Sequence, residues 1–395
     1  MRLIMNCESL HPPRTGIGVY TACLLSRWKD SALVNSISGF SGAGRLVDAF
    51  DLVKRAVAGG SPRRGQLISA AHRFAGQWQW PYALFRANER ARFRRATADL
   101  GPGWLYFEPN FILKPFDGPG VPVVHDLSFL KFPECHPAGR VRYLEKHLPA
   151  TLARAAHVIT PSELVRREII EQFGAGGDRI SAMHLGAAAR FGAVSPGAVR
   201  NTLTGHGLTA GRYILSVATA EPRKNLVRLM QAYQALPDGI RKAYPLVLVG
   251  PEGWKSDDFA TLKQKLERRG EVVSLGYVPD QELPALYTGA AVFAYPSIYE
   301  GFGLPVLEAM RSGTAVLTSR DTAMAEFGGD AVEYCDPFDV DSINAALKLL
   351  LNDPDRRRDL GENAQVQAGS FTWQRCADRH LEIFRQVMGE DVSSP

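Results

Sequence analysis

The sequence Glu300-Gly301-Phe302-Gly303-Leu304-Pro305-Val306-Leu307-Glu308 decides the fold, because it joins a predicted buried strand at 292–297 to a predicted helix. Pro305 stands where a first helical residue is expected. Its fixed φ suits that position, and its missing N–H would be unpaired there in any case. Gly301 and Gly303 permit the backbone to approach a ligand closely. A strand, a glycine-rich turn and a helix in this order are typical of α/β proteins.

Two carboxylates flank this predicted helix start. Glu300 is expected at the mouth of a site and Glu308 about one helical turn inside. The start of a helix presents free N–H groups and a positive dipole end, which suits a phosphate. A ligand with both phosphates and hydroxyls, such as a nucleotide sugar, fits this arrangement. The structural alternative is that glutamate is common in a first turn because it favours the helix dipole.

Several further motifs follow predicted strands in a fixed order along the chain. Before the stretch 300–308 come Gly16-Ile17-Gly18, His125-Asp126, Thr160-Pro161-Ser162 and Glu221-Pro222-Arg223-Lys224-Asn225. Together these motifs resemble the retaining glycosyltransferases of family GT4, over nearly the whole chain. The resemblance implies the GT-B fold, in which two Rossmann-like, doubly wound domains face each other across a cleft.

A chain of 395 residues is long for one core and comfortable for two domains. Short apolar strands alternate with helical segments in both halves, which implies parallel sheets. We expect an acceptor-side domain over 1–190, a donor-binding domain over 191–372, and a C-terminal helix over 373–395. In the resembled family this last segment returns towards the N-terminal domain. The pattern gives no clear assignment for residues 35–120.

Arg223 and Lys224 follow a predicted strand and open a predicted helix. A guanidinium can clamp phosphate oxygens bidentately and an ammonium adds a point charge. Placed at a donor diphosphate, both would stabilise the charge that grows on the leaving oxygen. A helix start disfavours cations, so a ligand-binding role is favoured over a surface charge pair. No Asp-x-Asp pair lies near a phosphate-binding helix start, and we expect the two cations to replace a divalent metal.

The resemblance assigns roles to three residues of the first half. Gly16 and Gly18 match a glycine-rich loop that approaches the diphosphate and the acceptor. His125 matches a histidine beside the donor sugar, which gives it a substrate-positioning role and not the role of a base. The alternative for His125 is a structural role, since a lone histidine is often structural.

The resemblance also assigns roles within 300–308. Glu300 matches the residue that binds hydroxyls of the donor sugar, and Glu308 the one that holds the ribose hydroxyls. Gly303 and Leu304, at the helix start, are expected donor contacts. Neither carboxylate is assigned as a covalent nucleophile. The resembled enzymes are thought to use a same-face substitution in which the leaving phosphate helps to deprotonate the acceptor.

The positive charge of the chain is local. Of the 46 basic and 41 acidic residues, ten basic and one acidic residue lie in the segment Lys54–Arg95, so that segment carries +9 and the remainder −4. Arg86, Arg90 and Arg94 recur at four-residue spacing and would share a helix face. Aromatic residues interleave with the charges, which favours an anionic membrane surface as partner over a nucleic acid, for which no motif is present. The alternative is an ordinary solvated surface.

The composition of the chain indicates the cellular compartment in which we expect the protein. The chain has no apolar run of 18 or more residues, and its N-terminus turns polar too soon for a signal peptide. The five cysteines are scattered and odd in number, which indicates free thiols in a reducing cytoplasm. We therefore expect a cytoplasmic protein that can lie peripherally on the inner face of the cytoplasmic membrane. These cysteines are Cys7, Cys23, Cys135, Cys335 and Cys376.

Within the GT4 family the chain resembles bacterial mannosyl- and rhamnosyltransferases of O-antigen or exopolysaccharide assembly. The resemblance implies a retaining hexosyltransferase of bacterial surface polysaccharide synthesis, and we expect it to be metal-independent, with no cofactor beyond its nucleotide-sugar donor. Mannose from GDP-mannose is the first choice of donor, and a lipid-linked or oligosaccharide molecule is the expected acceptor. The alternatives are an enzyme that uses a UDP-, ADP- or dTDP-sugar, a GT-B nucleotide-sugar epimerase, and a non-catalytic paralogue. An epimerase should lack the stretch 300–308 after a Pro-Arg-Lys-Asn motif, and retention of every motif disfavours the paralogue.

Overall fold

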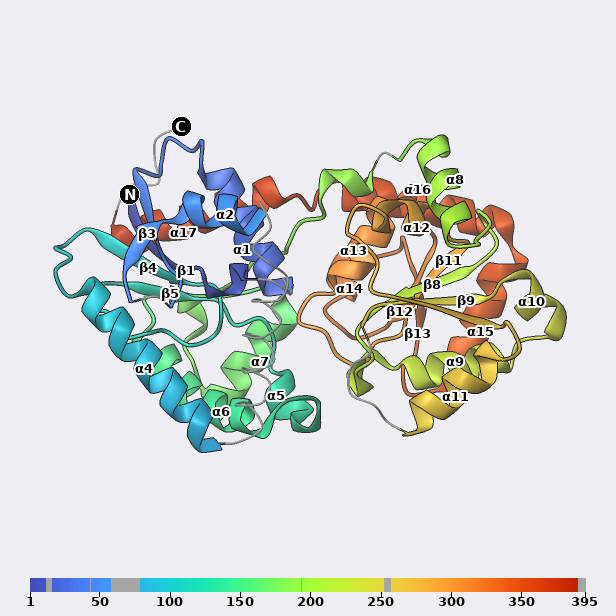
Figure 1. The fold of residues 1–395 in the computed structure, drawn as a ribbon, viewed down its shortest axis with the longest axis horizontal. Helices are drawn as coiled ribbons and strands as arrows, with labels where there is room; N and C mark the ends of the chain where they lie inside the picture. The colour runs from blue at the N-terminus through green and yellow to red at the C-terminus, as the bar shows by residue number, and fades with distance from the viewer. Residues whose placement is uncertain (12–15, 43, 58–78, 193, 252–256, 390–395) are drawn as a thin grey trace. The chain divides into compact units, whose positions relative to one another are not determined.

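The computed structural model describes residues 1–11, 16–42, 44–57, 79–192, 194–251 and 257–389, and the chain divides into two compact units (Figure 1). Unit 1 comprises Met1–Leu185 together with Trp373–Pro395, and unit 2 comprises Gly186–Thr372. The C-terminal helix α17 (Trp373–Met388) is therefore part of the N-terminal unit. The N-terminal part of unit 1 ends at Leu185, five residues before the expected domain end at residue 190.

Unit 1 is built on a five-stranded sheet in the order β3-β2-β1-β4-β5. All neighbours are parallel except β2 and β3. A second, two-stranded parallel pair joins the edge of this sheet through a bridge between Val123 and Ile159. The strands are β1 (Arg2–Asn6), β2 (Ser36–Phe40), β3 (Leu46–Asp48), β4 (Trp104–Glu108), β5 (Gly120–Pro122), β6 (Val158–Thr160) and β7 (Ile180–Ala182).

Helices surround the sheet of unit 1 (Figure 1). The first helix begins at Gly16, and Ser162 caps α7 by accepting from the N–H of Val165. Helix α17 packs against α1, where Nε1 of Trp28 donates to the carbonyl of Ala377 at 3.1 Å. The helices are α1 (Gly16–Trp28), α2 (Ala49–Val57), α4 (Gln79–Thr97), α5 (Ser128–Lys131), α6 (Ala138–Arg154) and α7 (Glu163–Phe173).

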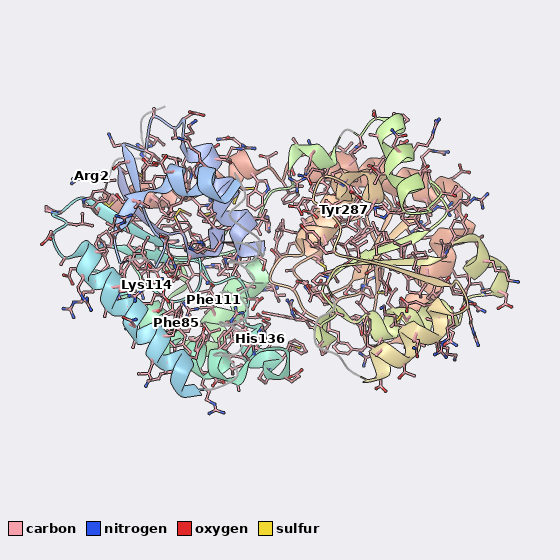
Figure 2. The ribbon with its side chains drawn as sticks, in the orientation of Figure 1. Arg2, Phe85, Phe111, Lys114, His136 and Tyr287 are labelled. Carbon is pink, nitrogen blue, oxygen red and sulfur yellow. The ribbon has the colours of Figure 1, made fainter. Side chains whose placement is uncertain are left out.

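Helix α4 carries most of the described part of the basic segment, and residues 58–78 of that segment lie outside the described residues. Arg86, one of the three arginines expected to share a helix face, is half-buried and paired inside unit 1. Its guanidinium donates to Glu89 at 2.6 Å, and Lys114 ties Glu89 (2.7 Å) to the buried Glu108 (3.2 Å) at the end of β4. Internal carboxylates thus draw Arg86 inward. Lys114 is labelled in Figure 2.

The outer face of α4 is apolar at one end and basic at the other. Leu84 is 69% exposed and Phe85, labelled in Figure 2, is 40% exposed. Arg94 and Arg95 are exposed nearly three turns later, whereas Phe93 is fully buried in the core of unit 1. Among the described residues, no helix combines the length and apolarity that crossing a bilayer requires.

Unit 2 is a six-stranded parallel sheet in the order β10-β9-β8-β11-β12-β13. The short strands follow the apolar runs in the sequence closely, and β9, β11 and β12 are buried along their whole length. Helix α9 buries Leu226, Leu229, Met230 and Tyr233. The chain reverses its direction of progress across the sheet between β8 and β11, so ligand-binding residues are expected at the carboxyl ends of these strands. The strands are β8 (Ile214–Val217), β9 (Leu246–Val249), β10 (Val272–Gly276), β11 (Val292–Tyr295), β12 (Val316–Ser319) and β13 (Glu333–Cys335).

Helices flank the sheet of unit 2 (Figure 1). They confirm the alternation of strand and helix on which the α/β prediction rests. Their bounds are α8 (Pro196–Gly205), α9 (Leu226–Gln234), α10 (Asp238–Ala243), α11 (Asp257–Glu267), α12 (Leu283–Gly289), α13 (Leu304–Arg311), α14 (Ala325–Gly328), α15 (Val340–Asn352) and α16 (Pro354–Ala368).

Candidate active site

Glu300 is a buried carboxylate, 7% exposed, in the turn between β11 and α13. Its Oε1 accepts hydrogen bonds from the hydroxyls of Tyr295 and Ser297, each at 2.9 Å, and from Nζ of Lys224. Its Oε2 accepts from Nη1 of Arg223 at 3.2 Å. Burial by itself would raise the pKa of Glu300, but the charges of Lys224 and Arg223 outweigh it and hold the pKa at about 2. Glu300 is therefore ionised at neutral pH.

Arg223 and Lys224 lie in a 3-10 turn, Pro222–Lys224, that follows β8 and precedes α9. The expectation that they open the helix itself is therefore wrong, and the helix begins two residues later at Leu226. Asn225 makes the connection with a left-handed φ of 61°, and its side-chain amide donates to the carbonyls of Pro296 (2.9 Å) and Pro337 (2.6 Å). These two bonds offset the cost of the left-handed backbone and fix the cationic turn against the end of β11.

The cationic turn is also tied directly to the loop that carries Glu300. The backbone carbonyl of Arg223 accepts from the N–H of Ile298 at 2.8 Å and from the hydroxyl of Ser297 at 2.9 Å. Burial lowers the pKa of Lys224, and the Glu300 carboxylate works against this shift. A diphosphate brought to this turn would meet two aligned cations whose geometry is set before it arrives.

Helix α13 begins directly after Gly303, whose φ is 102°. A Cβ at this position would lie 2.5 Å from Cγ of Met324, so both the backbone angle and the lack of space require glycine. Leu304 is the first residue of the helix and Pro305 the second, one position later than the sequence indicated. The helix start and the Glu300 turn therefore follow each other without a gap, as expected.

Glu308 lies in the second turn of α13, and a buried phenol fixes its orientation. The hydroxyl of Tyr287, on α12, donates to Oε2 of Glu308 at 3.1 Å (Tyr287 is labelled in Figure 2). Burial raises the pKa of Glu308 to about 7, although the Tyr287 hydrogen bond and the charge of Arg190 lower it in part. Sequence reasoning missed Tyr287, because a tyrosine in an apolar helix carries no separate signal.

The predicted site residues of unit 1 meet around α1. Gly16 and Gly18 lie in its first turn, directly after residues 12–15, which are outside the described residues. Tyr20 on the same helix packs edge-on against the ring of His125, with ring centroids 5.3 Å apart and an interplanar angle of 88°. Nε2 of His125 donates to the carbonyl of Pro109 at 2.7 Å. Burial lowers the pKa of His125, so its imidazole is neutral at neutral pH.

Each unit thus gathers its own set of predicted residues. In unit 2, Arg223, Lys224 and Glu300 are in direct contact, and Gly303, Leu304 and Glu308 follow on α13. In unit 1, Gly16, Gly18 and His125 are linked through α1. The unit 2 set combines cations, a helix start and two carboxylates at the carboxyl end of a parallel sheet, which is the arrangement expected for a nucleotide sugar.

Comparisons with known proteins agree with this geometry. The family model described as "Glycosyl transferases group 1" matches residues 206–367. The chain is 36% identical over 385 residues to O-antigen chain mannosyltransferase B of Escherichia coli, which covers 98% of this chain and 100% of the relative. It is also 31% identical to the serotype-specific mannosyltransferase WbdA of Escherichia coli. That match covers 67% of this chain and 33% of the length of WbdA.

A solved structure shows the same fold. Sucrose-phosphate synthase from Thermosynechococcus elongatus superposes with a TM-score of 0.73 at 18% identity, over 98% of this chain and 99% of that one. The GT-B fold that the motifs implied is thereby confirmed. With a relative that matches it over its full length, the chain belongs to the group 1 glycosyltransferase family and is a glycosyltransferase.

Proposed function

We propose that this glycosyltransferase transfers mannose from GDP-mannose, with retention of configuration and without a metal ion, to a lipid-linked or oligosaccharide acceptor of a bacterial surface polysaccharide. The names of the relatives support the sugar and the pathway, since an O-antigen chain mannosyltransferase matches over its whole length. The observation that carries the chemistry is the contact of Arg223 and Lys224 with the buried Glu300.

This contact supports a role in leaving-group stabilisation. When the glycosidic bond breaks, negative charge grows on the diphosphate oxygen. Arg223 offers a planar set of N–H donors and Lys224 a compact charge, and the turn around Asn225 holds both in place. Groups that are aligned in advance need little reorganisation as the charge develops, so they lower the barrier of the transfer step. Two such cations can do this work without a divalent metal.

The environment of Glu300 supports a binding role over a nucleophilic one. Its Oε1 already accepts three hydrogen bonds, and the two cations hold its pKa at about 2, so the carboxylate is a weak base and a poor nucleophile. Such a group suits hydrogen bonds from sugar hydroxyls. Retention would then proceed by attack on the face that the leaving group departs from, with the leaving phosphate helping to take the acceptor proton.

The position of Glu308 supports a role at the ribose. Tyr287 occupies its Oε2, which aligns the carboxylate one helical turn behind the start of α13. A vicinal pair of ribose hydroxyls can donate to a carboxylate held in this way. The names of the relatives supply the mannose, and GDP as the nucleotide is the expectation of the sequence analysis.

We also propose that the outer face of α4 docks on an anionic membrane beside a lipid-linked acceptor. Leu84 and Phe85 supply exposed apolar surface, and Arg94 and Arg95 supply exposed charge on the same helix. Each basic residue close to an anionic surface contributes about 1 kcal/mol, so a few residues are enough for reversible attachment. The net +9 of the segment Lys54–Arg95 motivates this proposal.

The donor and the stereochemistry can be tested together. Thermal shifts should be measured with GDP, UDP, ADP and dTDP and with their sugars, and we expect GDP and GDP-mannose to raise the Tm most. The product formed from GDP-mannose should then be examined by proton NMR of its anomeric signal. An α-linked product would agree with retention. A β-linked product, or a Tm that rises with UDP-sugars and not with GDP-mannose, would overturn the corresponding part of the proposal.

A further inference from the structure

A buried hydrogen bond joins the first helix of unit 1 to the last. The hydroxyl of Tyr20, on α1, lies 2.5 Å from Nε2 of His380, on α17, across 360 positions of sequence. Tyr20 is 1% exposed and His380 is fully buried. Two polar groups placed so deeply cost free energy unless they satisfy each other, so this pairing has to be explained.

The partners of His380 determine where its proton lies. Nδ1 of His380 lies 2.6 Å from the backbone carbonyl of Cys376. A carbonyl oxygen can only accept, so Nδ1 carries the proton and Nε2 is the acceptor. Burial lowers the pKa of His380 to about 4, so the ring stays neutral. The hydroxyl of Tyr20 must therefore donate to His380, which fixes the rotation of the phenol.

The ring of Tyr20 is in turn one wall around His125. Its edge-on contact with the imidazole has centroids 5.3 Å apart. On another side lies the ring of Phe111, 6.0 Å away and labelled in Figure 2. Phe111 has a φ of 61°, which is rare for a bulky residue and is maintained only where the surroundings enforce it. This turn begins beside Pro109, whose carbonyl accepts the proton of His125.

These contacts fix the tautomer of His125 as well as its orientation. Because the Pro109 carbonyl can only accept, Nε2 of His125 carries the proton and Nδ1 is the acceptor nitrogen of the ring. The ring keeps this state while it stays aligned with the carbonyl. The ring of Tyr20 packs against the imidazole of His125 and prevents it from tilting away. The hydrogen bond to His380 holds the Tyr20 ring in that place.

We propose that His380 and Tyr20 are positioning residues for His125, so that the C-terminal helix α17 sets the orientation and the tautomer with which His125 meets the substrate. The proposal rests on the substrate-positioning role of His125 in the proposed function. It adds that a residue far along the chain, which touches no substrate, governs the rate of transfer through one hydrogen bond and one ring contact.

A purely structural role predicts different behaviour from a positioning role. Trp28 provides the comparison, because its Nε1 also joins α1 to α17, by donating to Ala377. Trp28 is likewise buried, but its ring contacts are with Phe107, His380 and Phe384. If α17 only stabilises unit 1, loss of either hydrogen bond should lower the Tm and leave the rate of transfer unchanged.

The kinetic test uses the full-length protein with GDP-mannose and an oligosaccharide acceptor. His380→Phe strands the hydroxyl of Tyr20, and we expect kcat to fall about tenfold with little change in KM. Tyr20→Phe removes the same hydrogen bond but leaves no unpaired phenol hydroxyl to displace the ring from His125, so its kcat should fall less than that of His380→Phe, by about threefold. The double variant Tyr20→Phe/His380→Phe removes both polar groups, so it should recover most of the kcat that His380→Phe loses. Trp28→Phe should lower the Tm and spare kcat.

The spectroscopic test needs no substrate, so it separates this proposal from the choice of donor. Nitrogen-15 NMR of labelled histidines should show His125 protonated at Nε2 in the wild-type protein and in Trp28→Phe. In His380→Phe the two nitrogen signals should move towards each other as the tautomers mix. If His380→Phe cannot be purified, Tyr20→Leu, which removes the ring, gives the same measurement.

Unchanged His125 signals and an unchanged kcat in His380→Phe would overturn the proposal, as would a double variant no faster than His380→Phe. A wild-type protein that does not turn over GDP-mannose would count against the proposed donor alone, because the NMR result would still decide the role of α17.

Discussion

Arg223 and Glu300 lie 77 residues apart in the sequence, yet Nη1 of Arg223 donates to Oε2 of Glu300 at 3.2 Å. Lys224 donates to the other carboxylate oxygen. If a diphosphate draws the two cations away, Tyr295 and Ser297 still hold Oε1, and Oε2 can accept a sugar hydroxyl. The ion pair thus keeps the cations and the carboxylate aligned for two different parts of one donor.

Removing either cation should therefore impair transfer more than folding. We expect Arg223→Ala and Lys224→Ala each to lower kcat/KM by roughly 10²–10³, the scale of one lost charge-stabilising contact. Arg356→Ala is a matched control, since Arg356 is a cation on α16 of unit 2 that donates to Glu333 and not to Glu300 or Asn225. Near-normal kcat/KM in both Arg223→Ala and Lys224→Ala would refute the assignment.

The two carboxylates should separate nucleotide binding from sugar binding. Glu308→Ala should weaken the binding of free GDP by roughly 10- to 100-fold, because it removes a charged acceptor at the ribose. Glu300→Gln should leave the Kd for GDP nearly unchanged and lower only the turnover of GDP-mannose. Isothermal titration calorimetry measures the first effect and GDP release the second. Equal losses of GDP binding in both variants would contradict the division.

The raised pKa of Glu308 predicts that nucleotide binding depends on pH. Its pKa of about 7 in the free protein means that the carboxylate forms between pH 6 and pH 8. Because the ionised form accepts hydroxyl hydrogen bonds more strongly, GDP should bind more tightly as the pH rises through this range. Tyr287→Phe removes a bond that favours the carboxylate, so its binding curve should move to higher pH. Calorimetry at several pH values would reveal a flat curve if Glu308 plays no part.

The two cations also predict that catalysis survives removal of metal ions. Transfer from GDP-mannose should continue at an undiminished rate after treatment with EDTA and desalting. Added Mg²⁺ or Mn²⁺ should have little effect. An EDTA-treated enzyme that is inactive and regains activity with either ion would show that Arg223 and Lys224 are not sufficient for the leaving group.

The outer face of α4 predicts binding to anionic lipid. In liposome flotation, the protein should bind vesicles that contain phosphatidylglycerol and not neutral vesicles. Leu84→Ser/Phe85→Ser and Arg94→Glu/Arg95→Glu should each reduce binding, since they remove exposed apolar area or reverse exposed charge. Val366→Ser, at an 80% exposed position on α16 of unit 2, is the control. Binding that does not depend on lipid charge would show that α4 is an ordinary solvated surface. Arg86 is unsuitable for this test, because its loss would break the internal ion pairs.

Local sequence predicted unit 2 well because the interior strands β9, β11 and β12 are buried along their whole length. Short continuous apolar runs such as Leu246–Val249 and Val292–Tyr295 are typical of buried parallel strands. Gly301 and Gly303 mark the turn that follows β11. Strand β13, Glu333–Cys335, was missed because it is short, lies at the edge of the sheet and begins with a charged residue.

Unit 1 was harder to predict, for a physical reason that β4 illustrates. The strand Trp104–Glu108 ends in a fully buried carboxylate, which a local pattern treats as a surface residue. Glu108 is tolerated because Asn6, Tyr106 and Lys114 all donate to it, and Asn6 comes from a strand 102 positions away in the sequence. The same limit applies to Arg86, whose inward direction depends on Glu89 and the residues around Lys114.

The return of α17 to unit 1 has a consequence for biogenesis. Unit 2 is one uninterrupted segment, Gly186–Thr372, so all of its contacts are available once that segment has left the ribosome. Unit 1 must wait for residues 373–388, although most of its chain is made first. Until then the surface that receives Phe384, including Trp28 and Phe107, remains uncovered. The later unit can thus fold first, and a ribosome that stalls before α17 would release a chain with an apolar face open to chaperones and proteases.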